Sequence, residues 1–224
     1  MNISVIVPTV NSEKVIKNSI QHFENYLKKN KQVKKYEIII AAQSSDDNTF
    51  QVIKKLKSKT VKPLFIKIRG KGNGINHGIR AAKHELILII DDDLSYPIEF
   101  LDNALHYIQF YDIIIGSRYL TWQDIPMKRK IASWTYRMLV KTLFRIKQKD
   151  IQAGEKLVKK DIFKKIKVNQ SGYVWDTEFL SKANKQKLKI KEVPIKYDFR
   201  NNYLKVGRAA PKMFKEVMRL YFKK

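Results

Sequence analysis

The sequence of 224 residues contains no cysteine. This absence excludes a disulfide framework, a cysteine nucleophile and a zinc site with cysteine ligands. Long apolar runs are also missing, because the longest aliphatic stretch without a charge (residues 86–90) is far shorter than the roughly 18 residues of a membrane-spanning helix. Residues 1–8 lack the basic and apolar segments of a signal peptide. We therefore expect a soluble protein of a reducing compartment.

Acidic residues are scarce, since 21 Asp and Glu face 46 Lys and Arg and the formal net charge is +25. Such a balance favours a polyanionic partner, which could be nucleic acid, an anionic membrane or a phosphorylated substrate. Solvated lysines on every surface helix would give the same composition, so charge alone leaves both interpretations open. The four histidines form no H-E-x-x-H motif, and neither a G-x-S-x-G motif nor a pattern typical of RNA-binding or zinc-finger domains occurs.

The first half of the chain alternates predicted strands and helices. The strands are near-continuous aliphatic runs at residues 2–7, 36–42, 64–68, 86–90 and 112–115. This rhythm predicts an α/β fold with a mostly parallel central sheet and helices on both faces. In such a sheet the loops at the carboxyl ends of the strands converge on one ligand-binding edge. We expect the functional residues in these loops.

The second half predicts a basic helix over 127–147, short strands at 152–158, 190–193 and 195–197, and a helix near 177–186. From Pro211 the chain is again amphipathic and basic. We therefore predict one domain over 1–210 followed by a basic amphipathic helix over 211–224. The apolar stripes of the helices at 127–147 and 211–224 are typical of helices that lie on an anionic membrane, although both stripes could equally pack against the domain.

Three consecutive aspartates, Asp91, Asp92 and Asp93, follow an apolar strand. Adjacent carboxylates repel one another, and a cation relieves that repulsion. In extended backbone, residues i and i+2 point the same way, so Asp91 and Asp93 can share one divalent ion, with Mg²⁺ or Mn²⁺ as the candidates that keep positions for phosphate oxygens. A polar loop that caps the next helix is the alternative, and we favour the metal site.

Glycines surround Lys71 in the segment from Gly70 to Gly74, before a predicted helix. The spacing matches neither the Walker A nor the dinucleotide-binding fingerprint. Free backbone amides there could bind a nucleotide phosphate, with Lys71 beside it, but a tight turn between strand and helix explains the glycines equally well. Arg118 follows the fifth strand on the same predicted edge and could neutralise phosphate charge.

Five segments, taken in order, resemble family 2 glycosyltransferases, and most closely the dolichyl or polyprenyl phosphate mannose and glucose synthases. The segments are Val5-Ile-Val-Pro-Thr-Val-Asn11, Gly70-Lys-Gly72, Asp91-Asp-Asp-Leu-Ser-Tyr-Pro97, Gly116-Ser-Arg-Tyr119 and Glu192-Val-Pro-Ile195. The resemblance covers residues 3–207 and implies the GT-A fold of nucleotide-diphospho-sugar transferases.

The resemblance also implies roles for individual residues. The nucleotide pocket would include Pro8, Val10, Ser12, Ala41, Gln43 and Lys71. Asp91 and Asp92 would lie against ribose and phosphate, while Asp93, with Ser95 beside it, would be the principal metal position. Arg118, Arg200 and Lys205 would hold phosphates of the donor and the acceptor, and Asp93, Arg118 and Arg200 would be the catalytic residues.

The function implied is a metal-dependent, inverting sugar transfer from a nucleotide-diphosphate sugar to a polyprenyl phosphate. The enzyme would be cytoplasmic and peripheral on the cytoplasmic membrane face, with no nucleic-acid partner. Gln43 replaces an Asp of the family, and its amide offers one donor and one acceptor, which suits uracil better than guanine, so a UDP-sugar is favoured. A glycan, protein or small-molecule acceptor is the alternative within the family, and a basic nucleic-acid-binding protein is the alternative outside it.

Overall fold

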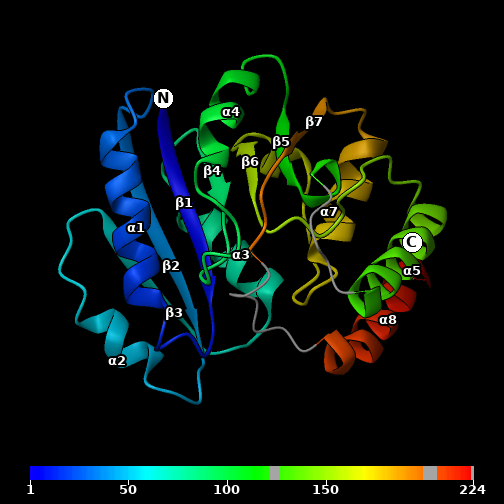
Figure 1. The fold of residues 1–224 in the computed structure, drawn as a ribbon, viewed down its shortest axis with the longest axis horizontal. Helices are drawn as coiled ribbons and strands as arrows, with labels where there is room; N and C mark the ends of the chain where they lie inside the picture. The colour runs from blue at the N-terminus through cyan, green and yellow to red at the C-terminus, as the bar shows by residue number, and fades with distance from the viewer. Residues whose placement is uncertain (122–126, 199–205, 223–224) are drawn as a thin grey trace.

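The computed structural model describes residues 1–121, 127–198 and 206–222. Its described part contains a seven-stranded sheet of order β3-β2-β1-β4-β6-β5-β7 (Figure 1). The strands are β1 (Asn2–Thr9), β2 (Lys35–Gln43), β3 (Val61–Ile66), β4 (Leu86–Ile89), β5 (Ile113–Ser117), β6 (Lys156–Lys159) and β7 (Ile190–Pro194). Neighbouring strands run parallel except that β6 is antiparallel to both β4 and β5. The mostly parallel sheet predicted from the aliphatic runs is confirmed.

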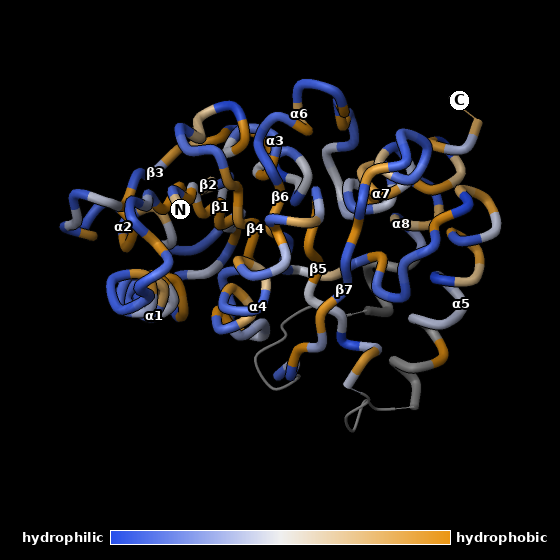
Figure 2. Tube along the Cα trace, turned by 90° about the horizontal axis from the view of Figure 1, so that it is seen from above, coloured by the Kyte–Doolittle hydropathy of each residue, from blue (hydrophilic) through white to orange (hydrophobic). Residues whose placement is uncertain are grey.

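Helices cover both faces of the sheet, as predicted. The helices are α1 (Ile16–Lys29), α2 (Thr49–Lys54), α3 (Lys71–Ala81), α4 (Phe100–Tyr107), α5 (Met127–Phe144), α6 (Ile162–Lys165), α7 (Trp175–Lys185) and α8 (Val206–Phe222), with a 3₁₀ turn, η1, at Arg118–Leu120. One face carries α1 and α4, while α3, α5, α7 and α8 lie on the other (Figures 1 and 2).

Alternating side chains of the strands make two apolar layers. In β2, Ile38 and Ile40 pack with the α1 side, whereas Ile39 packs with the α3 side. Burial on both faces explains why the strands are aliphatic throughout rather than alternating with polar residues. The helices contribute matching stripes, for example Ile20 and Phe23 of α1, which are buried against the first layer.

Several predicted boundaries were wrong. The loop predicted at 69–74 ends early because α3 already begins at Lys71, and the predicted strand at 152–158 is reduced to Lys156–Lys159. Residues 195–197 form no strand. Helix α8 begins at Val206 rather than at the predicted Pro211. Pro211 lies inside α8, beyond the first turn of the helix, so it does not mark the start of the helix as predicted.

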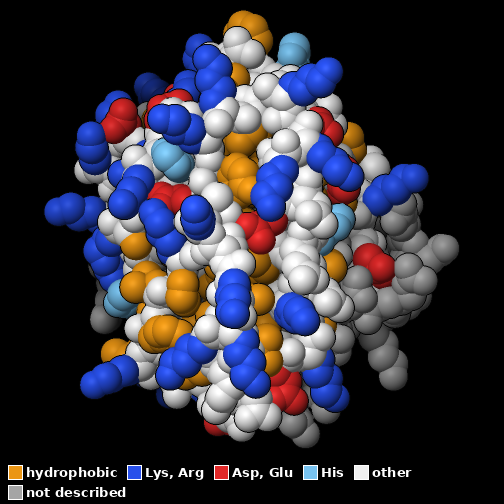
Figure 3. Space-filling view, turned by 90° about the vertical axis from the view of Figure 1, so that its left-hand side faces the viewer, with side chains coloured by type: hydrophobic (Ala, Val, Ile, Leu, Met, Phe, Trp, Pro, Cys, Tyr) orange, Lys and Arg blue, Asp and Glu red, His pale blue; other side chains and the backbone are white. Residues whose placement is uncertain are grey.

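The surface is basic in more than one place. Figure 3 shows Lys and Arg side chains spread over one whole face rather than gathered in a single patch. Within the described ranges, no helix combines the length and the apolar character needed to cross a bilayer. On the face shown, the basic side chains are therefore distributed as solvated surface charge.

A buried carboxylate, Glu37, ties together the amino-terminal edge of the sheet. It accepts hydrogen bonds from the Ser4 hydroxyl at 2.7 Å, the Lys83 backbone N–H at 2.7 Å and the Lys62 ammonium at 2.6 Å. Burial alone would raise the pKa of Glu37, but these donors, Lys62 first, hold that pKa below its ordinary value. Three strands and the connection before β4 thus meet at one charged group.

We expect Glu37→Gln to lower the free energy of unfolding at pH 7 by about 2 kcal/mol, because hydrogen bonds to a charged acceptor are lost. A depressed carboxyl pKa stabilises the fold above the unfolded value near 4.5, and this contribution disappears as the pH falls through the folded pKa. Urea denaturation at pH 7 and pH 3 measures the pH dependence, and the gap between variant and wild type should be smaller at pH 3 than at pH 7.

Asp161→Asn is the matched control, since Asp161 pairs with Lys164 on the open surface. It should leave the denaturation midpoint unchanged at pH 7. A Glu37→Gln loss of equal size at both pH values would show that the charge of Glu37 does not stabilise the fold.

Candidate active site at the carboxyl edge of the sheet

The three aspartates follow β4 at the carboxyl edge and face different partners. Asp92 accepts a hydrogen bond from the Ser12 hydroxyl at 2.6 Å, and its backbone carbonyl accepts one from the Ser19 hydroxyl at 2.6 Å. Asp91 instead forms an ion pair of 2.7 Å with the Lys71 ammonium. Asp93 accepts the backbone N–H of Ser95 at 3.0 Å. Asp92 is thus fastened to the α1 side, while Asp91 faces the α3 side.

Burial and mutual repulsion shift the acidity of the triplet. Burial, followed by the neighbouring carboxylates Asp91 and Asp93, raises the pKa of Asp92 to about 7 despite the Ser12 hydrogen bond. Burial and Asp91 likewise raise the pKa of Asp93. The cluster therefore holds less than three full negative charges near neutral pH, and a bound cation would favour its full ionisation.

The glycine segment forms the turn into α3 and the first turn of that helix, and it packs against other parts of the chain rather than forming an open phosphate cradle. Gly70 has φ +141°, and a Cβ there would lie 2.2 Å from the Ser171 carbonyl oxygen, so only glycine fits. The backbone N–H groups of Gly72 and Asn73 donate to the carbonyls of Gly172 and Ser171 at 3.2 and 2.9 Å. These amides are already used, so the turn interpretation is the one that the structure supports.

The predicted nucleotide residues lie at this edge, but several are covered. Pro8 and Ala41 are buried neighbours on β1 and β2, while Val10 is exposed. Gln43 is only 1% exposed, and its Oε1 accepts the Gly70 N–H at 2.5 Å. A Cβ on Gly74 would lie 2.7 Å from Gln43 Nε2, so α3 packs directly on this amide. Gln43 therefore supports the turn and does not offer a complete amide edge to a base.

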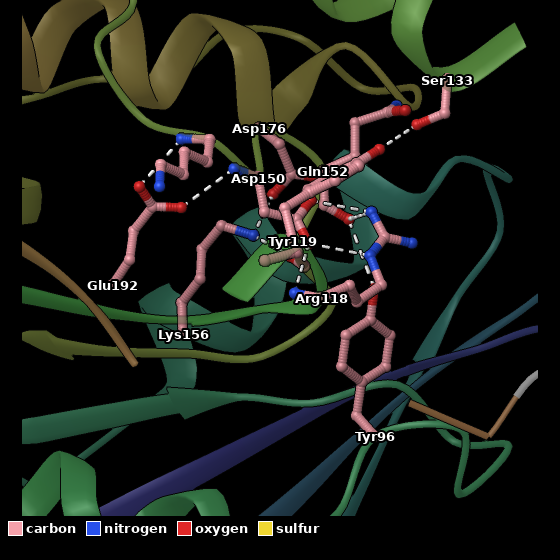
Figure 4. Close-up of polar contacts among 11 residues, drawn as sticks. Tyr96, Arg118, Tyr119, Ser133, Asp150, Gln152, Lys156, Asp176 and Glu192 are labelled. Carbon is pink, nitrogen blue, oxygen red and sulfur yellow. Dashed lines mark hydrogen bonds and ion pairs between the residues drawn. The ribbon is translucent and has the colours of Figure 1, made fainter. Parts of the chain in front are cut away.

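Arg118, after β5, is held in a partly buried ionic cluster (Figure 4). Its Nε and Nη2 each donate to Asp150 at 2.8 Å, and its backbone N–H donates to the same carboxylate at 3.0 Å. Glu192 accepts the backbone N–H groups of Lys149 and Asp150 at 2.8 and 2.9 Å, which fixes the segment that carries Asp150. Asp150 is therefore the buried ion-pair partner of Arg118.

Aromatic rings complete the surroundings of Arg118. The guanidinium carbon lies 5.8 Å from the ring centre of Tyr96 and 5.3 Å from that of Tyr197, and these two rings meet edge to face at 4.7 Å. Asp150 raises the pKa of Arg118 against the effect of burial. Arg118 is thus a charged residue packed among acids and rings, and its orientation is fixed by the fold.

Sequence reasoning missed a second buried ion pair, in which the Lys156 ammonium lies 2.6 Å from Asp176 Oδ1. Both side chains are almost completely buried, and Figure 4 shows them next to the Arg118 cluster. The available signal was Lys156 directly before the apolar Leu157 and Val158 of β6, because a buried lysine requires an acidic partner.

Arg200 and Lys205, two predicted phosphate-binding residues, lie outside the described residues.

Glu155 is a buried acid directly before β6. Neither of its carboxyl oxygens has a hydrogen-bond partner among the residues that the structure describes. Burial, and then the charge of Asp91, raises the pKa of Glu155. The edge of the sheet thus gathers acids and bases from loops that are far apart in the chain.

Comparison with known proteins identifies the family. The model of glycosyl transferase family 2 matches residues 4–167. The chain is 27% identical over 208 residues to the dolichol-phosphate mannosyltransferase of Pyrococcus furiosus, covering 89% of this chain and 57% of that protein. It is 29% identical over 244 residues to the dolichyl-phosphate beta-glucosyltransferase of Dictyostelium discoideum, covering 99% and 74%. The chain spans only 33% of the length of a third relative, the glycosyltransferase AglD of Haloferax volcanii, to which it is 25% identical over 207 residues.

The fold is that of GT-A glycosyltransferases. Glucosyl-3-phosphoglycerate synthase of Mycobacterium tuberculosis, solved with Mn²⁺, UDP and glucosyl-3-phosphoglycerate, superposes with a TM-score of 0.75 at 16% identity, covering 98% of this chain and 79% of that one. The family model includes the acidic triplet and most of the sheet, and the predicted resemblance is thereby confirmed. The chain belongs to glycosyl transferase family 2.

Proposed function

We propose that this chain transfers a sugar from a nucleotide-diphosphate sugar to a polyprenyl phosphate, with Mg²⁺ or Mn²⁺ as cofactor. The observation that carries the proposal is the partly buried Asp91–Asp93 triplet at the carboxyl edge of a family 2 domain, the edge at which open α/β sheets bind ligands. The acceptor class follows from two relatives, which are named for transfer to dolichyl phosphate.

The residues present fit a divalent ion. Asp91 and Asp93 supply carboxylate oxygens, and the buried Ser95 hydroxyl has no hydrogen-bond partner within the part of the chain that the structure describes. No group of three or more His, Cys, Asp or Glu side chains there is arranged to hold a metal alone. Mg²⁺ is commonly bound by one or two carboxylates together with substrate phosphates and water, so this donor set is sufficient. When bound, the ion would neutralise charge on the donor diphosphate.

The chemistry needs little from a general base. An oxygen of the acceptor phosphate forms the new bond to the anomeric carbon, the bond from that carbon to the nucleoside diphosphate breaks, and the configuration inverts. A phosphate is already ionised near neutral pH, so no side chain has to remove a proton first. Arg118, fixed by Asp150, would keep positive charge beside the reacting groups, and Arg200 and Lys205 would add to it.

Activity is tested by incubating the protein with sugar nucleotides and a polyprenyl phosphate, with product analysis. Asp93→Asn removes a charged ligand without changing shape, so turnover should fall by orders of magnitude while the circular dichroism spectrum stays unchanged. EDTA should abolish turnover, and Mn²⁺ or Mg²⁺ should restore it. Full activity in excess EDTA would disprove the metal requirement, and transfer only to soluble acceptors would disprove the lipid acceptor.

We infer that the donor is a UDP-sugar. The sequence suggested a UDP-sugar because the Gln43 amide could recognise uracil. The structure does not support this reason, because Gln43 Oε1 already accepts the Gly70 N–H. The remaining support is that glucosyl-3-phosphoglycerate synthase, which has the same fold, was solved with UDP and with UDP-glucose.

Calorimetric titration with UDP and GDP in the presence of Mn²⁺ measures the preference, and UDP should bind about tenfold more tightly, which corresponds to about 1.4 kcal/mol. Gln43→Ala should weaken both nucleotides to the same extent, because this residue supports the turn rather than the base. Tighter binding of GDP would overturn the choice of donor.

A membrane-facing surface would bring the lipid phosphate to this site. The stripe of α5 is divided: Val140 and Phe144 are buried against the domain, whereas Ile131, Trp134 and Met138 remain exposed. Helix α8 lies beside α5 (Figures 1 and 2), with Val217 buried and aromatic side chains exposed. Its residues Phe214, Lys215, Met218, Arg219 and Phe222 line a hollow of about 470 Å³. Apolar and cationic side chains together suit an anionic bilayer at the cytoplasmic face.

Flotation with vesicles that contain phosphatidylglycerol tests this surface. Wild type should associate at low salt and dissociate at high salt, because each basic residue near an anionic surface contributes about 1 kcal/mol that salt screens. The double variant Trp134→Ser, Phe222→Ser should lose most of the association. Phe110→Ser, at an exposed phenylalanine on the connection after α4, is the matched control and should float like wild type. No flotation of wild type at low salt would contradict the surface assignment.

A further inference from the structure

The Lys71 ammonium forms an ion pair with Asp91, which is one of the two proposed metal ligands. Its Nζ lies 2.7 Å from Asp91 Oδ1, and only about a fifth of the side chain is exposed. Asp176 and Asp93 also act electrostatically on this ammonium and, after Asp91, favour its charged form. Lys71 is therefore the nearest positive charge to the triplet among the ion pairs of the described residues.

The backbone holds Lys71 in this place. It is the first residue of α3, between Gly70, whose N–H bonds to Gln43, and Gly72, whose N–H bonds to the Gly172 carbonyl. The neighbouring acid Asp176 cannot easily replace Asp91 as its partner, because Asp176 already pairs with the buried Lys156 at 2.6 Å. The contact between Lys71 and Asp91 is thus built in by the turn and by the second ion pair.

An ammonium and a divalent cation compete for the same carboxylate. A cation bound between Asp91 and Asp93 would be repelled by a charge that lies within hydrogen-bond distance of Asp91, and repulsion at a few ångströms in a partly buried site is strong. Without the ammonium, however, the carboxylates would repel each other in the metal-free protein. The same side chain therefore stabilises the empty site and opposes its filling.

We propose that Lys71 is an internal counter-ion that competes with the divalent metal for Asp91 and thereby sets the metal affinity of the site. The inference rests on the proposed function, because it assumes that Asp91 and Asp93 bind the cofactor. It assigns to Lys71 a role different from phosphate binding.

The test measures Mn²⁺ binding without nucleotide, by titration calorimetry and by the electron paramagnetic resonance signal of free Mn²⁺. Lys71→Met keeps most of the length of the side chain and removes the charge, and it should bind Mn²⁺ at least tenfold more tightly than wild type. Lys67→Met, at an exposed lysine before the same turn, makes the same change in net charge and should stay within twofold of wild type. The melting temperature of metal-free Lys71→Met should be lower, and Mn²⁺ should recover it.

The outcomes separate this inference from the proposed function. If wild type binds Mn²⁺ but Lys71→Met binds it equally or more weakly, the counter-ion role is wrong and the metal site stands. If neither protein binds Mn²⁺, and Asp93→Asn behaves like wild type, both the metal site and the inference fail.

A measurement on wild type covers the case in which Lys71→Met does not fold. The nitrogen resonance of the Lys71 ammonium should shift on addition of Mg²⁺ while that of Lys67 stays in place. An unchanged Lys71 signal at saturating Mg²⁺ would overturn the proposal.

Discussion

Three carboxylates at the end of one buried strand are the constraint on which the carboxyl edge depends. The fold compensates each of them separately: Ser12 and Ser19 hold Asp92, the Lys71 ammonium neutralises Asp91, and the Ser95 amide donates to Asp93. These partners come from the loop after β1, from α1, from α3 and from the loop after β4. Because the strands are parallel, one edge can collect all of them.

The ionic cluster around Arg118 stabilises the other half of that edge. Glu192 of β7 holds the segment of Asp150, and Asp150 in turn orients Arg118 after β5. An unpaired charge at this depth would be costly, so each member of the cluster requires the next. The carboxyl edge is therefore an arrangement of neutralised charges on a rigid aliphatic sheet, which is suitable for binding phosphates in a fixed orientation. At the amino-terminal edge, the buried acid Glu37 has a structural role, because it connects neighbouring strands.

The sequence predicted those features that depend on local patterns. Aliphatic runs predicted the strands of the parallel part, and the position of the aspartates after the fourth run predicted that they lie at the carboxyl edge of the sheet, as the structure shows. The phosphate cradle could not be decided in this way, because the amides of Gly72 and Asn73 are taken by carbonyls about a hundred residues later in the chain. The burial of Gln43 under α3 and the partner of Lys156 likewise depend on packing between distant segments. Helix limits were shifted because tertiary packing, not Pro211 or the glycines alone, decides where a helix begins.

The central claim is that the acidic edge after β4 binds a divalent cation together with the donor diphosphate. Anomalous diffraction from crystals grown with Mn²⁺ and UDP locates the ion directly. The account predicts a single strong peak within about 2.5 Å of carboxylate oxygens of Asp91 and Asp93, with the Ser95 hydroxyl close by and the Lys71 ammonium displaced from Asp91. A peak elsewhere in the molecule, or bound UDP with no peak and the contact between Lys71 and Asp91 intact, would contradict it.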